Sequence, residues 1–147
     1  MTINELTNNF DAGLQELYAG RAKSALRLFE KAAAEDNTPL VRSYIAYCRA
    51  RTGCSCLESV AICMDAHREE PKNTDIYLNL GKIYLLAGKR KQAIQIFRLG
   101  LRQGRNMRLS AELNSLGVRK SPPFPFLQRN NPLNKYAGLL LTRLSLR

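Results

Sequence analysis

The segment 75–101, DIYLNLGKIYLLAGKRKQAIQIFRLGL, decides the fold of this 147-residue chain. Apolar residues recur every three or four positions on both sides of Gly88, which is the pattern of two amphipathic helices. A glycine directly after the first apolar run is typical of a helix C-terminus. The segment therefore predicts a helical hairpin whose turn lies at Gly88.

The same pattern occurs 68 residues earlier in the sequence. Ala25 and Phe29 correspond to Ala93 and Phe97, and each copy has one glycine inside its first helix and a second glycine in its turn. Glycine inside a helix costs about 1 kcal/mol relative to alanine, so we expect a packing reason for it. Because 68 is twice 34, a third copy is expected between these two.

The middle copy is present in a weaker form. Ser59, Cys63 and Ala66 lie 34 residues after Ala25, Phe29 and Ala32. Gly53 comes one residue earlier than the same period predicts. That offset predicts one extra residue in the middle turn, near Cys54. A 34-residue period of helical hairpins predicts a solenoid, because each hairpin has an apolar side that only the next hairpin covers.

The sequence thus predicts an all-α protein, a short α-solenoid of about three helix-turn-helix repeats with a capping helix and a C-terminal tail helix. The predicted repeat domain spans residues 1–117, and a proline-containing segment with an amphipathic helix spans 118–147. Within the domain we expect three repeats at about 6–39, 40–73 and 74–107. The capping helix is expected at 106–116.

The chain resembles the tetratricopeptide repeat family at its signature positions. These positions are Tyr77, Leu80, Gly81, Tyr84, Ala93 and Phe97, with Pro71 closing the middle repeat. The resemblance implies a non-enzymatic scaffold or adaptor in which the first helix of each repeat lines a concave groove for a partner's peptide or helix. The groove residues that it implies are Phe10, Leu14, Tyr18, Tyr44, Tyr47, Leu78, Asn79 and Lys82.

Family members that bind chaperone tails hold the terminal carboxylate with a clamp of lysine, asparagine and arginine. The corresponding positions here are Phe10, Leu14, Tyr44, Asp75 and Asn79. Only Asn79 is polar and neutral, so the resemblance disfavours that class of partner.

The charge distribution supports an alternative function. The formal net charge is +11, and residues 82–147 contain fourteen basic residues and one acidic residue. Such a field attracts nucleic acid or another anionic surface, although no motif with stacking aromatic residues accompanies it. The predicted basic patch comprises Lys89, Arg90, Lys91, Arg98, Arg102, Arg105 and Arg108.

Signals for catalysis, metal binding or a cofactor are weak. The chain has one histidine, which excludes a site with several histidines within one chain, and it has no glycine-rich phosphate loop. The residues that could ligate zinc are Cys48, Cys54, Cys56, Cys63 and His67, but their spacing is not a common zinc pattern. We therefore expect that the thiols are reduced, that the protein binds no cofactor and that it has no enzymatic activity.

The remaining expectations concern location and the tail. There is no run of eighteen apolar residues and no secretory signal at the N-terminus, so we expect a cytoplasmic protein without a transmembrane segment. Leucines of the tail repeat with helical spacing over 133–144. This helix is expected to pack on its own chain, with self-association, a partner helix and a membrane surface as alternatives.

Overall fold

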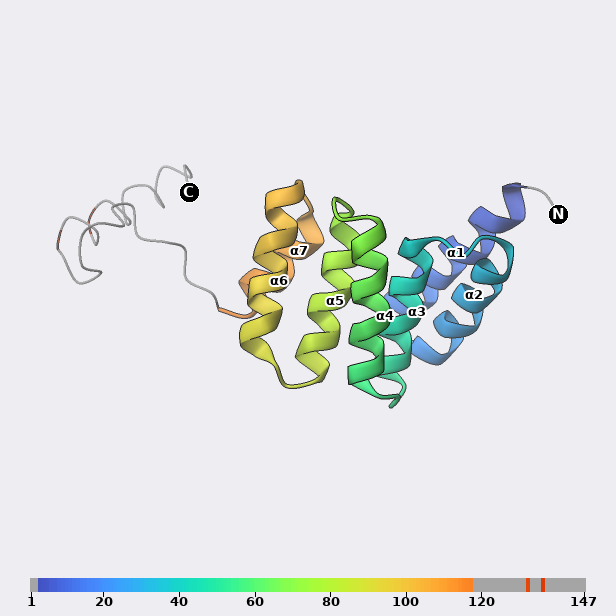
Figure 1. Cartoon of the computed structure of the whole chain (residues 1–147), viewed down its shortest axis with the longest axis horizontal. Coiled ribbons are helices and arrows are strands. Elements are labelled where there is room, and N and C mark those ends of the chain that lie inside the picture. The colour runs from blue at the N-terminus through green and yellow to red at the C-terminus, as the bar shows by residue number, and fades with distance from the viewer. Residues whose placement is uncertain (1–2, 118–131, 133–135, 137–147) are drawn as a thin grey trace. The chain divides into compact units, whose positions relative to one another are not determined.

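A computed structural model describes residues 3–117, Pro132 and Tyr136 of this chain, and of residues 3–8 it describes the backbone alone. Every regular element in this part is a helix, as Figure 1 shows. The helices are α1 (Ile3–Tyr18), α2 (Ala22–Glu35), α3 (Pro39–Arg51), α4 (Cys56–Glu69), α5 (Thr74–Leu86), α6 (Arg90–Gln103) and α7 (Met107–Ser115).

The first six helices form three hairpins, α1–α2, α3–α4 and α5–α6, and α7 follows them. The stack runs in chain order, because α3 packs on both α2 and α5, and α4 packs on α5 (Figure 1). The turns of the first and third hairpins have three residues, whereas the middle turn, 52–55, has four. The extra residue predicted near Cys54 is therefore present, and the predicted all-α solenoid is confirmed.

Glycine inside the first helix of a hairpin has a steric cause. A Cβ atom on Gly13 would lie 2.7 Å from Cε1 of Phe29, and one on Gly81 would lie 2.5 Å from Cδ1 of Phe97. Both phenylalanines are 0% exposed, so their rings are enclosed by the core. The repeated glycine and the repeated phenylalanine are thus two halves of one contact.

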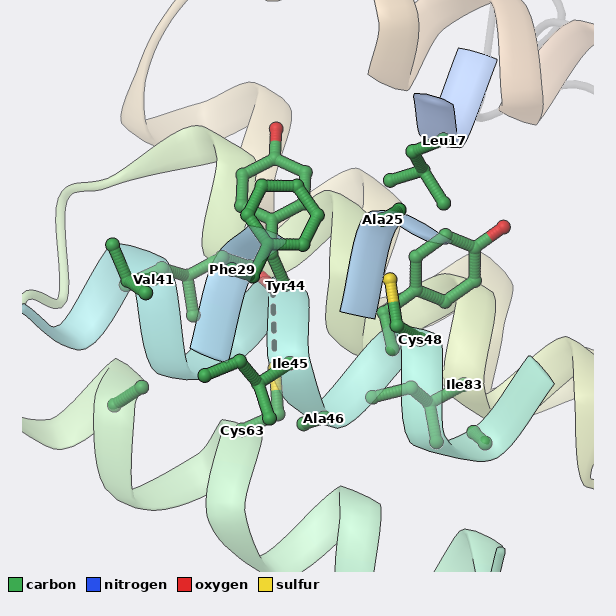
Figure 2. Packing of buried hydrophobic residues seen from close by; sticks show 14 of the residues in the cluster. Leu17, Ala25, Phe29, Val41, Tyr44, Ile45, Ala46, Cys48, Cys63 and Ile83 are labelled. Atoms are coloured by element: carbon green, nitrogen blue, oxygen red, sulfur yellow. Dashed lines mark hydrogen bonds between the residues drawn. The ribbon is translucent and has the colours of Figure 1, made fainter. Parts of the chain in front are cut away.

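The core between the first and second hairpins is aromatic. The rings of Phe29 and Tyr44 lie together in Figure 2. They are stacked, with centroids 5.1 Å apart. The ring of Phe10 is tilted against that of Phe29, with centroids 5.6 Å apart, and meets that of Tyr44 edgewise at 5.5 Å. Stacked and tilted aromatic pairs add to the free energy gained by burying their area. This cluster joins α1, α2 and α3 into one body.

The middle hairpin replaces the large aromatic residue with a thiol. Cys63 is fully buried, and its Sγ donates to the carbonyl oxygen of Ile76 at 3.7 Å, drawn as a dashed line in Figure 2. Ile76 and Ile83 of α5 are also fully buried and belong to the same apolar cluster as Cys63. Cys63 is therefore a core residue that contacts the third hairpin.

Residues after the cap form a separate unit, Gly117–Arg147, of which the structure describes Gly117, Pro132 and Tyr136. The tail helix expected over 133–144 and its packing lie outside the described residues. In the described part of the chain, none of the helices combines the length and apolar character that crossing a membrane requires.

Candidate functional site

Six of the eight predicted groove residues line one cavity of about 50 Å³. The odd-numbered helices α1, α3, α5 and α7 supply its walls, while α2, α4 and α6 contribute none of its residues. We call it the tyrosine cavity. Its lining residues are Leu17, Tyr18, Tyr44, Tyr47, Arg51, Leu78, Asn79, Lys82 and Arg108.

Two cations flank the ring of Tyr47 in the tyrosine cavity. Nζ of Lys82 lies 5.5 Å from the ring centroid, and Cζ of Arg51 lies 5.9 Å from it. Cations over an aromatic face are attracted by its quadrupole. Burial raises the pKa of Tyr47 above its ordinary value, so its hydroxyl stays protonated at neutral pH. The cavity therefore presents a neutral aromatic floor with positive charge around it.

Arg108 connects the first and last helices across the tyrosine cavity. Its Nη1 donates to the hydroxyl of Tyr18 on α1, and its Cζ lies 5.9 Å from that ring's centroid. Its Nη2 donates to both carboxylate oxygens of Asp75 on α5, at 2.9 and 3.0 Å. Arg108 therefore lies in the cavity rather than with the other residues of the predicted basic patch, because Asp75 holds it there.

Two further contacts hold α7 in place. Asn106 caps α7 by accepting from the backbone N–H groups of Arg108 and Leu109, and its amide donates to Asp75 at 2.8 Å. Lys82 pairs with Glu112 of α7 at 3.1 Å between Nζ and Oε1. Ion pairs this exposed contribute about 1 kcal/mol or less each. These polar contacts add to an apolar one, because Leu109 of α7 is fully buried and packs with Tyr77 and Phe97.

Exposure divides the predicted groove residues into two kinds. Tyr18 is 60% exposed, whereas Tyr44, Leu78 and Asn79 are nearly fully buried. The amide of Asn79 donates to Oγ of Ser43 at 3.0 Å, which commits it to the protein interior. Side chains that a partner could reach are therefore Tyr18 and the surrounding cations.

The two remaining predicted groove residues lie elsewhere on the odd-numbered helices. Phe10 lines a separate, largely apolar pocket of about 210 Å³, and Leu14 packs partly buried against the core. Two carboxylates, those of Asp11 and Asp36, also line that pocket. The predicted groove is therefore not one continuous cavity in this structure.

Six of the seven predicted basic-patch residues are exposed on or beside α6. None of these six lies within ion-pair distance of a carboxylate among the described residues. We call this set the α6 basic face. It comprises Lys89, Arg90, Lys91, Arg98, Arg102 and Arg105.

All four cysteines are free thiols, and they differ in burial. Burial raises the pKa of Cys48 and of Cys63 to about 12, so both stay neutral thiols at physiological pH. Cys54 is exposed in the four-residue turn, and Cys56 begins α4. The described residues contain no group of three cysteine, histidine or carboxylate side chains that could hold a metal ion.

Sequence reasoning missed Arg51 and Leu17 and misplaced Arg108 relative to the tyrosine cavity. Leu17 directly precedes Tyr18 at the end of α1, and both residues line the cavity. Arg51 lies four residues after Tyr47, one helical turn away, and that spacing was the available signal. The partner of Arg108 was not readable from the sequence, since Asp75 is 33 residues away.

Comparison with known proteins supports the same fold. A family model described as "Tetratricopeptide repeat" matches residues 58–116. This range begins at the third residue of α4 and ends directly after α7. No curated protein matched the chain.

Several solved tetratricopeptide repeat domains are similar in structure. The first such domain of human RPAP3 has a TM-score of 0.59 at 17% identity, covering 76% of this chain and 89% of that one. The first such domain of Spaghetti (RPAP3), solved with the HSP90 peptide SRMEEVD, has a TM-score of 0.60 at 16% identity, covering 80% and 96%. The Sgt2 domain from Aspergillus fumigatus has a TM-score of 0.59 at 15% identity, covering 89% and 93%.

Proposed function

We propose that this chain, a protein of the tetratricopeptide repeat fold, is a non-enzymatic adaptor that binds a peptide or helix of a partner protein. The binding surface is the groove formed by α1, α3, α5 and α7, with the tyrosine cavity at its centre. One observation carries the proposal: residues from all four odd-numbered helices, and from no other helix, converge on that cavity.

The chemistry of the cavity suits a peptide. Tyrosine offers a broad apolar face and a hydroxyl, and it is enriched where proteins bind other proteins. Tyr18 is 60% exposed at the rim, beside the cations Arg51, Lys82 and Arg108. A solved domain of the same fold holds the HSP90 peptide SRMEEVD, which supports peptide binding as the kind of activity.

The cavity must open for a peptide to enter. Its volume of about 50 Å³ is too small for more than a small side-chain group, and Arg108 and Tyr18 bridge it. The side chain of Arg108 is 41% exposed, so a partner can displace it into solvent at the loss of its hydrogen bonds to Asp75. A partner that satisfies Arg108 or Tyr18 with its own polar groups replaces the bridge and keeps these groups hydrogen-bonded.

Affinity capture from the native host tests the proposal when it compares matched variants. Wild type, the groove variant Tyr18→Ala with Arg51→Ala, and the control Leu57→Ala with Arg68→Ala each serve as bait at moderate salt. Leu57 is 76% exposed on α4, so the control removes one apolar residue and one arginine outside the groove.

A partner retained by wild type and control but lost by the groove variant is the expected result. A synthetic peptide from that partner should then bind at least ten times more weakly to the groove variant in calorimetry. The proposal is wrong if every retained protein is lost equally from the groove and control variants, or if the peptide binds all three chains equally.

A further inference from the structure

The outward side of α6 carries a row of cations. Lys91, Arg98 and Arg102 are spaced i, i+7 and i+11, which places them on one side of the helix. All three are exposed, whereas Ala93 and Phe97 on the opposite side are fully buried. At 1.5 Å per residue the row is about 16 Å long.

Nothing in the described structure neutralises this row. The sequence contains no aspartate or glutamate between Asp75 and Glu112, and both of these carboxylates are paired, with Arg108 and Lys82. Arg90, beside the row, donates to the carbonyl oxygen of Leu116 and keeps its full charge. The α6 basic face is therefore a surface of one sign.

The equivalent helix of the first repeat, α2, shows that the fold does not require a surface of one charge at this place. α2 also exposes cations, Arg27 and Lys31 among them, but its own sequence contains Glu30 and Glu35. Glu30 pairs with Arg49 at 3.3 Å. The outer helices of the stack thus share their buried positions and differ in their outward charge.

A uniform row of cations favours a polyanion over a single charged group. Four of the six residues of the α6 basic face are arginines, whose planar guanidinium groups bind phosphate with two parallel hydrogen bonds. Duplex nucleic acid carries one charge per about 1.7 Å of its axis, so several phosphates lie within reach of the row. An anionic membrane fits less well, because the exposed side chains of α6 include one large apolar residue, Leu99.

We propose that the α6 basic face binds the phosphodiester backbone of a nucleic acid without reading its bases. The only aromatic residue of α6 is Phe97, which is buried and unavailable for stacking on a base. The face contributes no residue to the tyrosine cavity, so this activity is independent of peptide binding. Together the two surfaces would let one chain join a protein to a nucleic acid.

Fluorescence anisotropy of the full chain with two labelled probes tests the proposal. The probes are a 20-nucleotide uridine strand and a 20-base-pair duplex DNA of arbitrary sequence, each at 50 and 200 mM salt. If four cations contact the duplex, a slope of about −0.9 per contact predicts that affinity falls about 150-fold over this range.

Matched double variants locate the contacts. Arg98→Gln with Arg102→Gln removes two contacts, so the same change in salt should lower its duplex affinity only about 12-fold. Arg27→Gln with Lys31→Gln removes the same net charge from α2 and should keep the wild-type salt dependence. Circular dichroism melting of each variant confirms that it is folded.

Binding of both probes, with the salt dependence reduced in the α6 variant alone, supports the proposal. Equal salt dependence in the two variants contradicts it, because any cations would then serve. Absence of binding at 50 mM salt also contradicts it, as does binding to phosphatidylserine vesicles without binding to either nucleic acid.

Discussion

Gly81→Ala should destabilise the protein although alanine is the better helix former. Removing the glycine inside α5 gains about 1 kcal/mol of helix propensity. The new methyl group would overlap the Phe97 ring, lying 2.5 Å from Cδ1 and 2.8 Å from Cζ. Overpacking a filled core costs typically about 1–3 kcal/mol, and here the ring is fully buried with three of its atoms in the way. The three overlapping ring atoms place the cost in the upper half of that range, at about 2–3 kcal/mol, so we expect a net loss of about 1–2 kcal/mol.

Urea unfolding at 25 °C, followed by far-ultraviolet circular dichroism, measures this loss. Phe97→Leu removes two of the three ring atoms that the new methyl group meets, Cε1 and Cζ, so it should reduce the effect of Gly81→Ala. The double-mutant cycle should give an interaction free energy of about 1 kcal/mol or more in the favourable direction. Gly13→Ala should cost less than Gly81→Ala, because its Cβ would meet the Phe29 ring at 2.7 Å and beyond.

A stabilising Gly81→Ala variant would refute the steric account of the repeated glycine. Additive effects of Gly81→Ala and Phe97→Leu would also refute it, since side chains that do not touch show no interaction energy. Either outcome would mean that the glycine at this position is retained for a reason other than the phenylalanine of the following helix.

Four further predictions concern the core, the thiols, the dependence of stability on pH and the tail. Phe29→Ala should lower the free energy of unfolding by about 3–5 kcal/mol, measured by urea denaturation, because it empties a fully buried site. In native protein a disulfide reagent should modify Cys54 readily and Cys48 and Cys63 only after unfolding, and elemental analysis should find less than one zinc per chain. Burial raises the pKa values of Cys48 and Cys63 to about 12. The contribution of these two thiols to stability is therefore present below the ordinary thiol pKa and is lost as pH rises towards 12. The melting temperature should fall over that range. Deleting 121–147 should raise binding of a hydrophobic dye if the tail covers apolar surface, and an unchanged, equally stable monomer would contradict that expectation.

The sequence by itself determined the architecture. The period of 34 residues is a local signal, because each hairpin repeats the same succession of helix, turn glycine and helix, with small residues at matching positions. The extra residue of the middle turn was readable as a one-residue shift of Gly53, and it is present between α3 and α4. The resemblance to the tetratricopeptide repeat family indicated the groove residues, and six of those eight line one cavity.

The tertiary structure decided which of those residues are accessible and how their charges are paired. Asn79 belongs to the predicted groove, yet its amide is bound to Ser43, 36 residues away, and is buried. Arg108 looked like one member of a basic run, yet Asp75 and Tyr18 hold it across the tyrosine cavity. The physical reason is common to both cases. Helical periodicity assigns a side chain to a face, whereas its partner is fixed by which distant helix the stacking brings opposite that face, and no local pattern encodes this.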